Sequence, residues 1–199
     1  MILELAAATG ARRGEVMALR WSDIRNDRAF VTRSLSQVKA QVFFKDVKTK
    51  KSNRPISLPP STLAMLNTHR VKQAEFREQF GQDYRTDLDL IICEREGSPL
   101  KPDTISATVS RYCRKLKLKG ALHTLRHSHA SQLLAAGVPL PDVSARLGHS
   151  NVYVTASVYA HALPGRDEEV ARIWERVAGR KVHPKSTAQP DTPTSKEIN

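Results

Sequence analysis

Cysteine is scarce in this sequence, and the two thiols do not form a recognisable site. Cys93 and Cys113 lie 20 residues apart, and no Cys-x-x-Cys pair is present. Such sparse usage indicates neither a disulfide framework nor a cysteine-based zinc site, and it fits a reducing compartment. We therefore expect a cytoplasmic protein.

Long apolar runs are missing as well. No stretch of the chain approaches the length that a membrane-spanning helix needs, and no signal peptide precedes the first helical segment. We expect no membrane partner, which agrees with a cytoplasmic location.

Acidic residues are few compared with basic ones. The 199 residues include 32 lysines and arginines against 20 aspartates and glutamates, for a formal net charge of +12. An excess of this size favours anionic partners, of which nucleic acid is the commonest, although a basic balance can also serve solubility alone. With 40% hydrophobic residues, the chain suits one ordinary domain with a real core.

The hydrophobic pattern predicts a mainly helical fold. Apolar residues recur at helical spacing in residues 2–8 and 13–20, which Gly10 separates. Further helices are expected at residues 60–80, 102–116, 123–136, 141–147 and 166–178. Because a natural domain seldom begins on a core helix, we expect that upstream residues, including a whole N-terminal domain, are missing from this chain.

A short β section follows the first two predicted helices. Residues 29–33, 41–47 and 54–59 are rich in branched and aromatic side chains and are separated by polar turns. They predict a small antiparallel sheet at one edge of the helical fold. Residues 87–93 are expected to form a buried extended segment.

The C-terminal part changes character twice. Segment 166–178 carries one apolar stripe on an otherwise charged helix, made of Val170, Ile173, Trp174 and Val177. After Gly179 the chain turns to Pro, Ser, Thr and Lys, a composition typical of disorder. We therefore expect one domain over residues 1–179 and a disordered tail over 180–199.

The segment "HTLRHSHA", residues 123–130, holds three histidines and one arginine, and could bind a metal, move protons or bind an anion. His123 and His127 have a metal-ligand spacing. The H-E-x-x-H pattern is absent, however, and Arg126 beside such a site would repel a cation. The residues therefore disfavour a metal, although satisfied histidines at a helix start would also explain the cluster.

Four segments in this order resemble the catalytic domain of the tyrosine recombinase (phage integrase) family, across nearly the whole chain. "TGARRGEVMALRWSDI" resembles the first arginine box of that family, and "VKTKKSNRPISLP" resembles its β-hairpin lysine segment. "HTLRHSHA" resembles the H-x-L-R-H box, and "LGHS" with "TASVYAHAL" resembles the closing histidine and tyrosine. The resemblance implies a mainly α fold with a small antiparallel β-sheet at one edge (α+β). It also implies the catalytic residues Arg12, Lys48, His123, Arg126, His149 and Tyr159.

The implied reaction is site-specific cleavage and rejoining of double-stranded DNA through a 3′-phosphotyrosyl intermediate, with no cofactor and no metal. The guanidiniums of Arg12 and Arg126 would clamp the non-bridging oxygens of the scissile phosphate with directional hydrogen bonds. His123 and His149 would donate to the same oxygens or exchange the proton of the nucleophile.

The nucleophile and the general acid each have neighbouring alternatives. Tyr159 is preferred to Tyr153 as the covalent nucleophile, because it precedes a Pro-Gly hinge and matches the family's tyrosine. A lysine would protonate the departing 5′-hydroxyl. Lys48 matches the family pattern, while Lys50 and Lys51 in the same turn remain alternatives.

Several neighbours receive a lesser role. Arg13 is the alternative to Arg12 as the catalytic arginine. Glu15 is expected to be a supporting acid, and the alternative is that it only neutralises the charge at a helix start. His127 and His129 are expected to be structural, and His161 is given no role.

Two other functions compete with strand exchange: relaxation of DNA by a type IB topoisomerase, and non-catalytic DNA binding by a fragment. The phage-like ending "YAHALPGRDEE" speaks against the topoisomerase, and the intact set of catalytic positions speaks against the fragment. The resemblance further implies self-association on DNA, in a tetrameric synapse that the C-terminal helix joins. Whether that helix packs in cis or in trans stays open.

Overall fold

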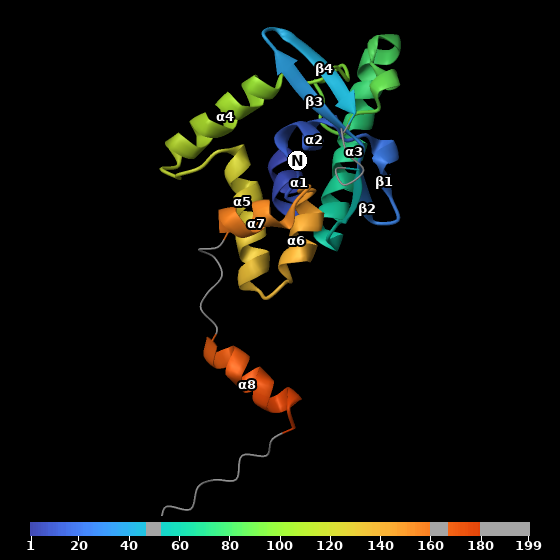
Figure 1. The fold of residues 1–199 in the computed structure, drawn as a ribbon. Helices are drawn as coiled ribbons and strands as arrows, with labels where there is room; N and C mark the ends of the chain where they lie inside the picture. Colours follow the sequence, from blue (N-terminus) through green and yellow to red (C-terminus); the bar gives the residue numbers. More distant parts are fainter. Residues whose placement is uncertain (47–52, 160–166, 180–199) are drawn as a thin grey trace, which may run out of the picture. The chain divides into compact units, whose positions relative to one another are not determined.

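The computed structural model of the chain describes residues 1–46, 53–159 and 167–179 (Figure 1). The chain forms two compact units, Met1–Leu163 and Pro164–Asn199. No helix in these described ranges is both long and apolar enough to cross a bilayer.

The first unit is mainly helical, as the apolar spacing predicts. Its helices are α1 (Ile2–Thr9), α2 (Arg13–Ala18), α3 (Pro60–Phe80), α4 (Pro102–Lys115), α5 (Leu122–Ala135), α6 (Leu140–Leu147) and α7 (Val152–Tyr159). Helices α3, α4 and α6 have a proline in the first turn, where its fixed φ and missing N–H suit a helix start. Helices α1 and α6 end at Gly10 and Gly148, both in the left-handed conformation.

The strands form two small antiparallel sheets rather than the single predicted sheet. One sheet has the order β1-β2-β5, with β1 (Ile24–Arg25), β2 (Arg28–Val31) and β5 (Arg54–Ser57). The other pairs β3 (Arg33–Val38) with β4 (Gln41–Asp46). The sequence pattern did not predict β1 or β3. Strand β3 is largely polar and buries only Leu35, so its position depends on pairing with β4.

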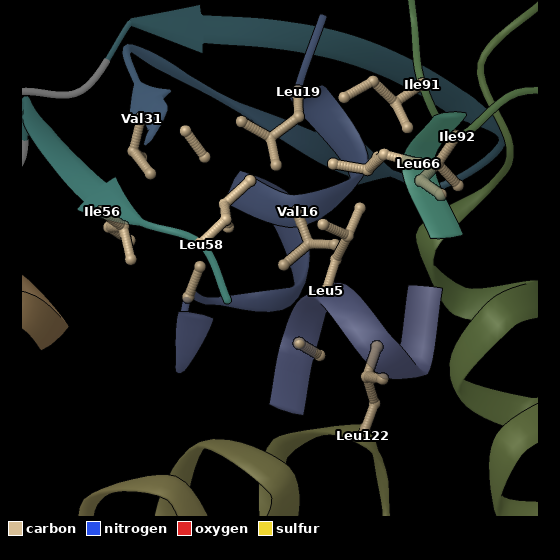
Figure 2. Close-up of a cluster of buried hydrophobic side chains, with 13 residues drawn as sticks. Leu5, Val16, Leu19, Val31, Ile56, Leu58, Leu66, Ile91, Ile92 and Leu122 are labelled. Atoms are coloured by element: carbon tan, nitrogen blue, oxygen red, sulfur yellow. The ribbon is translucent and has the colours of Figure 1, made fainter. Parts of the chain in front are cut away.

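The main core lies among α1, α2, α3 and the three-stranded sheet (Figure 2). Leu5 of α1 and Val16 of α2 are fully buried in this cluster, to which β5 contributes Ile56. The predicted extended segment 87–93 contributes Ile91 and Ile92 to this cluster, so its expected burial is confirmed for these two residues. The core therefore fixes the residues before α2 relative to strand β5.

A second apolar cluster joins the later helices. Ala130 and Leu134 of α5 pack on Val143 and Leu147 of α6. Helix α5 also packs along α1, and α6 packs on α7 (Figure 1). The ends of α1 and α6 are thereby brought to the side of α5 that carries Arg126.

The second unit contains the helix α8 (Asp167–Val177) in its described part. Its bounds match the predicted helix to within a residue at each end. All four residues of the predicted apolar stripe are exposed on it.

Candidate active site

Arg126 lies in the second turn of α5 and is buried, with only 4% of its surface exposed. Its Nη1 donates a hydrogen bond to the carbonyl of Gly10 (2.6 Å), and its Nη2 donates to the carbonyl of Leu147 (2.9 Å). These two carbonyls stand at the C-terminal ends of α1 and α6, where the helix dipoles favour a cation. The orientation of this guanidinium is therefore fixed by two helix ends.

The glycines beside these carbonyls are needed for space as well as for backbone conformation. Gly10 has φ +63°, and a Cβ there would lie 2.6 Å from Cδ2 of His129. Gly148 has φ +69°, and a Cβ there would lie 2.5 Å from Nη1 of Arg54. Any larger residue at either position would displace the side chains that build the site.

Glu15 links two arginines. Its Oε1 accepts a hydrogen bond from Nη1 of Arg12 (2.9 Å), and its Oε2 accepts from the backbone N–H of Arg12 (2.9 Å) and from Nη2 of Arg54 (3.0 Å). Burial alone would raise the pKa of Glu15. The charge of Arg54 and the hydrogen bonds from both arginines outweigh that effect, and the pKa is lowered. Glu15 is therefore an ionised, buried carboxylate, and not simply a residue that neutralises a helix start.

Arg54 is a residue of this cluster that the sequence reasoning missed. It is 5% exposed and begins β5, directly after the lysine-rich turn. A signal was present in the sequence, because residues 54, 56 and 58 share one face of an extended strand, and the apolar Ile56 and Leu58 mark that face as buried. An arginine on a buried face requires a partner, which here is Glu15.

His149 is neutral and has a defined tautomer. Its Nε2 lies 2.8 Å from Nη2 of Arg126, and its Nδ1 lies 2.8 Å from Oγ1 of Thr155. Because a guanidinium can only donate, Nε2 is the acceptor, and Nδ1–H donates to the fully buried Thr155 of α7. Burial, followed by the charges of Arg126 and Arg12, lowers the pKa of His149 to about 4. Nε2 is therefore unprotonated at neutral pH, and its lone pair can accept a hydrogen bond or a proton.

His123 is exposed in the first turn of α5, three residues before Arg126 and on the same side of the helix. Its ring packs edge-on against His127, with ring centroids 4.6 Å apart. Partial desolvation of the ring by the surrounding side chains, then the charges of His127, Arg126 and Arg12, lowers the pKa of His123. The charges of the same two arginines thus act on both His123 and His149.

His129 joins three helices. Its Nε2 accepts a hydrogen bond from Nε of Arg146 (3.0 Å), so its Nδ1–H donates to the carbonyl of Ala7 (2.8 Å). Burial and the charge of Arg146 lower its pKa. This geometry connects α5 to α1 and α6, as expected for a structural residue.

Other predicted residues lie at the border of the described ranges or beyond it. Tyr159 is the last residue of α7, one turn after Thr155. Tyr153, the alternative nucleophile, is 73% exposed at the start of the same helix. Lys48 and its alternatives Lys50 and Lys51 lie outside the described residues, as does His161.

Arg13, the alternative to Arg12, points elsewhere. Its Nη1 donates to the carbonyl of Pro102 (3.1 Å) and to Oγ of Ser106 (2.6 Å), and so joins α2 to the start of α4. The neighbouring Arg12, whose side chain is 46% exposed, is the arginine that contacts Glu15.

The arrangement is suited to an anion. Arg12 and Arg54 both bind the carboxylate of Glu15, and Arg126 adds a third guanidinium at the ends of α1 and α6. Positive charge is therefore in excess, and part of it reaches solvent through Arg12, whose side chain is 46% exposed. Within the described residues, no group of three or more His, Cys, Asp or Glu side chains could hold a metal ion. A phosphate beside the arginines would meet both fixed hydrogen-bond donors and a histidine that can take up a proton.

Comparison with known proteins gives consistent matches. The model of the phage integrase family matches residues 1–166. A tyrosine recombinase XerC-like protein of Caldanaerobacter subterraneus is 32% identical over 174 residues, covering 80% of this chain and 44% of that protein. The ICEBs1 integrase of Bacillus subtilis is 31% identical over 172 residues, covering 84% of this chain and 46% of that protein. The chain thus spans about half the length of these relatives.

Solved structures share the fold. The Tn1549 transposon integrase in complex with a circular intermediate DNA superposes with a TM-score of 0.70 at 19% identity, covering 88% of this chain and 57% of that chain. The XerH site-specific recombinase bound to its difH substrate superposes with a TM-score of 0.61 at 26% identity, covering 87% of this chain and 46% of that chain.

Proposed function

Because the chain belongs to the phage integrase family, we propose that it is the catalytic part of a tyrosine recombinase that cleaves and rejoins double-stranded DNA at specific sites. The observation that carries the proposal is the fixed guanidinium of Arg126 beside the neutral ring of His149. The DNA in the solved complexes of the Tn1549 integrase and of XerH is further support. We assign the catalytic domain to residues 1–179.

The arginines would bind the scissile phosphate. In the transition state of phosphoryl transfer, negative charge spreads over the non-bridging oxygens, and donors fixed in advance stabilise that charge without reorganisation. Arg126 is held in place by two helix ends, and Arg12 extends toward solvent from Glu15. Together they would clamp the phosphate at the mouth of the site.

The histidines would take up the proton of the nucleophile. The Nε2 lone pair of His149 can accept a proton, and the negative charge of a bound phosphate would raise the pKa of this ring from its low value. Once protonated, Nε2–H would donate to a non-bridging oxygen. His123 is the second candidate for either task, because the charges of Arg12 and Arg126 also act on it.

Covalent cleavage would follow. The hydroxyl oxygen of Tyr159 attacks phosphorus as its proton passes to Nε2 of His149. The bond from phosphorus to the 5′-oxygen breaks, and Lys48 gives a proton to the departing 5′-oxygen, which leaves as a hydroxyl. The DNA strand is then held as a 3′-phosphotyrosyl linkage, which stores the energy of the phosphodiester. Attack by the 5′-hydroxyl of a second strand reverses the step and completes the exchange, with no cofactor in the chemistry.

A suicide substrate tests the enzyme proposal. The chain is incubated with a pool of duplexes of varied sequence that carry nicks, so that the short 5′-hydroxyl strand diffuses away after cleavage and traps the adduct. Denaturing gels would then detect protein that is covalently bound to DNA, and sequencing of the trapped strands would identify the site. DNA binding without any adduct would support the non-catalytic alternative instead. Relaxation of supercoiled DNA without strand exchange would support a topoisomerase, which the match to the integrase family disfavours.

We further propose that the chain self-associates on DNA through α8, as a tetrameric synapse requires. Val170, Ile173, Trp174 and Val177 are each between 46% and 73% exposed in their own unit. A stripe of this kind on one face of a charged helix needs a partner surface. The catalytic domain of a neighbouring copy is the partner that we propose.

A further inference from the structure

Arg54 is placed between two parts of the site that come from distant segments of the chain. Its Nη2 donates to Oε2 of Glu15 (3.0 Å), and its Nε donates to the carbonyl of Arg146 (2.7 Å). These two N–H groups lie on the same edge of the planar guanidinium. One rigid group therefore connects the start of α2 to the end of α6.

We propose that Arg54 is a positioning residue for strand cleavage, which holds Arg12 through Glu15 and holds His149 through the turn that precedes it. This inference rests on the proposed function, because it assigns Arg12 and His149 their roles at the phosphate. It concerns a residue that touches neither the DNA nor the nucleophile in the proposed mechanism.

The first connection affects the charge of Arg12. The carboxylate of Glu15 is shared, with Oε1 bound to Arg12 and Oε2 bound to Arg54 as well as to a backbone N–H. Two guanidiniums around one carboxylate leave a net positive charge, part of which is available to a phosphate. Without Arg54, the carboxylate would neutralise Arg12 alone, and the attraction of Arg12 for a phosphate would fall.

The second connection affects the place of His149. Arg54 holds the carbonyl of Arg146, and Arg126 holds the next carbonyl, that of Leu147. Gly148 then lies directly on the guanidinium of Arg54, since a Cβ there would be only 2.5 Å from Nη1. His149 follows at once in the chain, so two arginines on consecutive carbonyls determine where its ring can lie.

Lysine could not replace Arg54 in this role. The ammonium of lysine is a single point at the end of a flexible stem, whereas the guanidinium presents several donors in a fixed plane. A lysine at position 54 would keep the charge beside Glu15 but would not hold Glu15 and the carbonyl of Arg146 at a set separation. The conservative variant therefore separates charge from geometry.

Cleavage by variants of the full chain tests the proposal. The rate of adduct formation is measured at saturating nicked duplex, and the Kd for DNA is measured in parallel. We expect Arg54→Met and Arg54→Lys to lower the cleavage rate about 100-fold, the effect of a small misplacement of reacting groups. The Kd for DNA should change far less, because Arg54 is buried and its contacts are within the protein. Unchanged cleavage rates in both variants would overturn the proposal.

A double variant controls for the loss of stability that Arg54→Met can cause. Arg54→Met leaves Glu15 as a buried charge with one partner fewer, which can destabilise the chain. Glu15→Gln combined with Arg54→Met removes both charges and should restore stability. If Arg54 acts through Glu15, the cleavage rate of the double variant falls below that of the wild type by clearly less than the product of the two single-variant losses. Full additivity of the two effects on the rate would contradict the connection through Glu15.

The matched control is Arg33→Met. Arg33 also donates to two backbone carbonyls, those of Ala18 and Leu88, but it contacts none of the groups proposed to act on the phosphate. We expect Arg33→Met to lower stability and to leave the cleavage rate of the folded protein within about threefold of the wild type. A loss of rate in Arg33→Met as large as that in Arg54→Met would reduce the role of Arg54 to general stability.

The titration of His149 supplies a measurement that does not depend on cleavage. Burial, followed by the charges of Arg126, Arg12 and Arg54, lowers the pKa of this ring, and the charge of Glu15 opposes them. Arg54→Met should therefore shift the histidine's NMR titration to higher pH, and Arg33→Met should not. If the wild type forms no adduct with any duplex, the proposed function fails. The titration then decides whether Arg54 controls His149, and an unchanged titration in Arg54→Met would overturn that claim.

Discussion

Arg126 donates a hydrogen bond to Nε2 of His149 over 2.8 Å, and this contact fixes both the charge and the tautomer of the ring. The ring has its proton on Nδ1, and this N–H donates a hydrogen bond to Oγ1 of Thr155. The ring atom that faces Arg126 is therefore an unprotonated Nε2 in the DNA-free protein. If a phosphate binds between the two residues, one of its oxygens would replace Nε2 as the acceptor for Arg126. The negative charge of the phosphate would then favour protonation of the ring.

Tyr159→Phe removes only a hydroxyl, so we expect it to abolish the covalent adduct with a nicked duplex while the Kd for DNA stays nearly unchanged. Tyr153→Phe is the matched control, because Tyr153 lies in the same helix and is 73% exposed. Denaturing gels and a binding titration measure the two quantities. An adduct that survives in Tyr159→Phe and disappears in Tyr153→Phe would reverse the assignment.

Stability should fall as the pH is lowered. The pKa of His149 is lowered from 6.5 to about 4 in the folded chain, so the unfolded chain takes up a proton first. The stabilisation is fully present above pH 6.5 and is lost as the pH falls toward 4, with an upper limit of about 3 kcal/mol. Urea unfolding at pH 7 and pH 5 measures the difference, which His149→Asn should reduce.

Part of that pH dependence should remain in His149→Asn, because the pKa of His129 is also lowered. The double variant with His129→Gln should lose this remaining part as well. A pH dependence that is the same in the wild type and in both variants would show that neither His149 nor His129 contributes to it.

Gly148→Ala should impair both stability and cleavage. The substitution places a Cβ at φ +69° and 2.5 Å from Arg54, so we expect a loss of about 1–3 kcal/mol and a larger loss of the cleavage rate. Gly81→Ala is the control, since Gly81 also has a positive φ but has nothing within 4 Å of an added Cβ. We expect Gly81→Ala to lose stability alone. Equal losses of cleavage rate in the two folded variants would count against a special role of the turn at Gly148.

Removal of α8 should weaken association on DNA. Truncation after residue 164 takes away the apolar stripe, and Trp174→Asp places a charge within it, on a side chain that is 66% exposed in its own unit. Both should reduce the size of complexes in native gels, whereas Glu175→Gln, a change beside the stripe, should not. Complexes of unchanged size after truncation would contradict docking of α8 on a neighbouring copy.

DNA binding by the chain alone should be weak and should depend strongly on salt. The net charge of +12 predicts that contacts with phosphates supply most of the affinity, so the logarithm of the binding constant should fall linearly with the logarithm of the salt concentration. Fluorescence titration of a duplex at several salt concentrations measures the slope. An affinity that is indifferent to salt would contradict this expectation.

Local structure could be predicted from the sequence because its causes are local. Apolar spacing, prolines at helix starts and glycines at helix ends predict every helix except α7 to within two residues at each end. The motif segments predict Arg12, His123, Arg126 and His149 as members of one site. Strand β3 was missed because a largely polar strand carries little periodicity, and only pairing with β4 decides its place.

The connections within the site were decided only by the tertiary structure. Arg126 reaches Gly10 across 116 residues of sequence, and Arg54 reaches Arg146 across 92 and Glu15 across 39. No local pattern encodes such contacts, because each one forms only when the two elements that carry its residues have packed together. The tautomer of His149 likewise depends on partners from α5 and α7. The sequence determined which residues could build an anion site, and packing determined which of them hold one another in place.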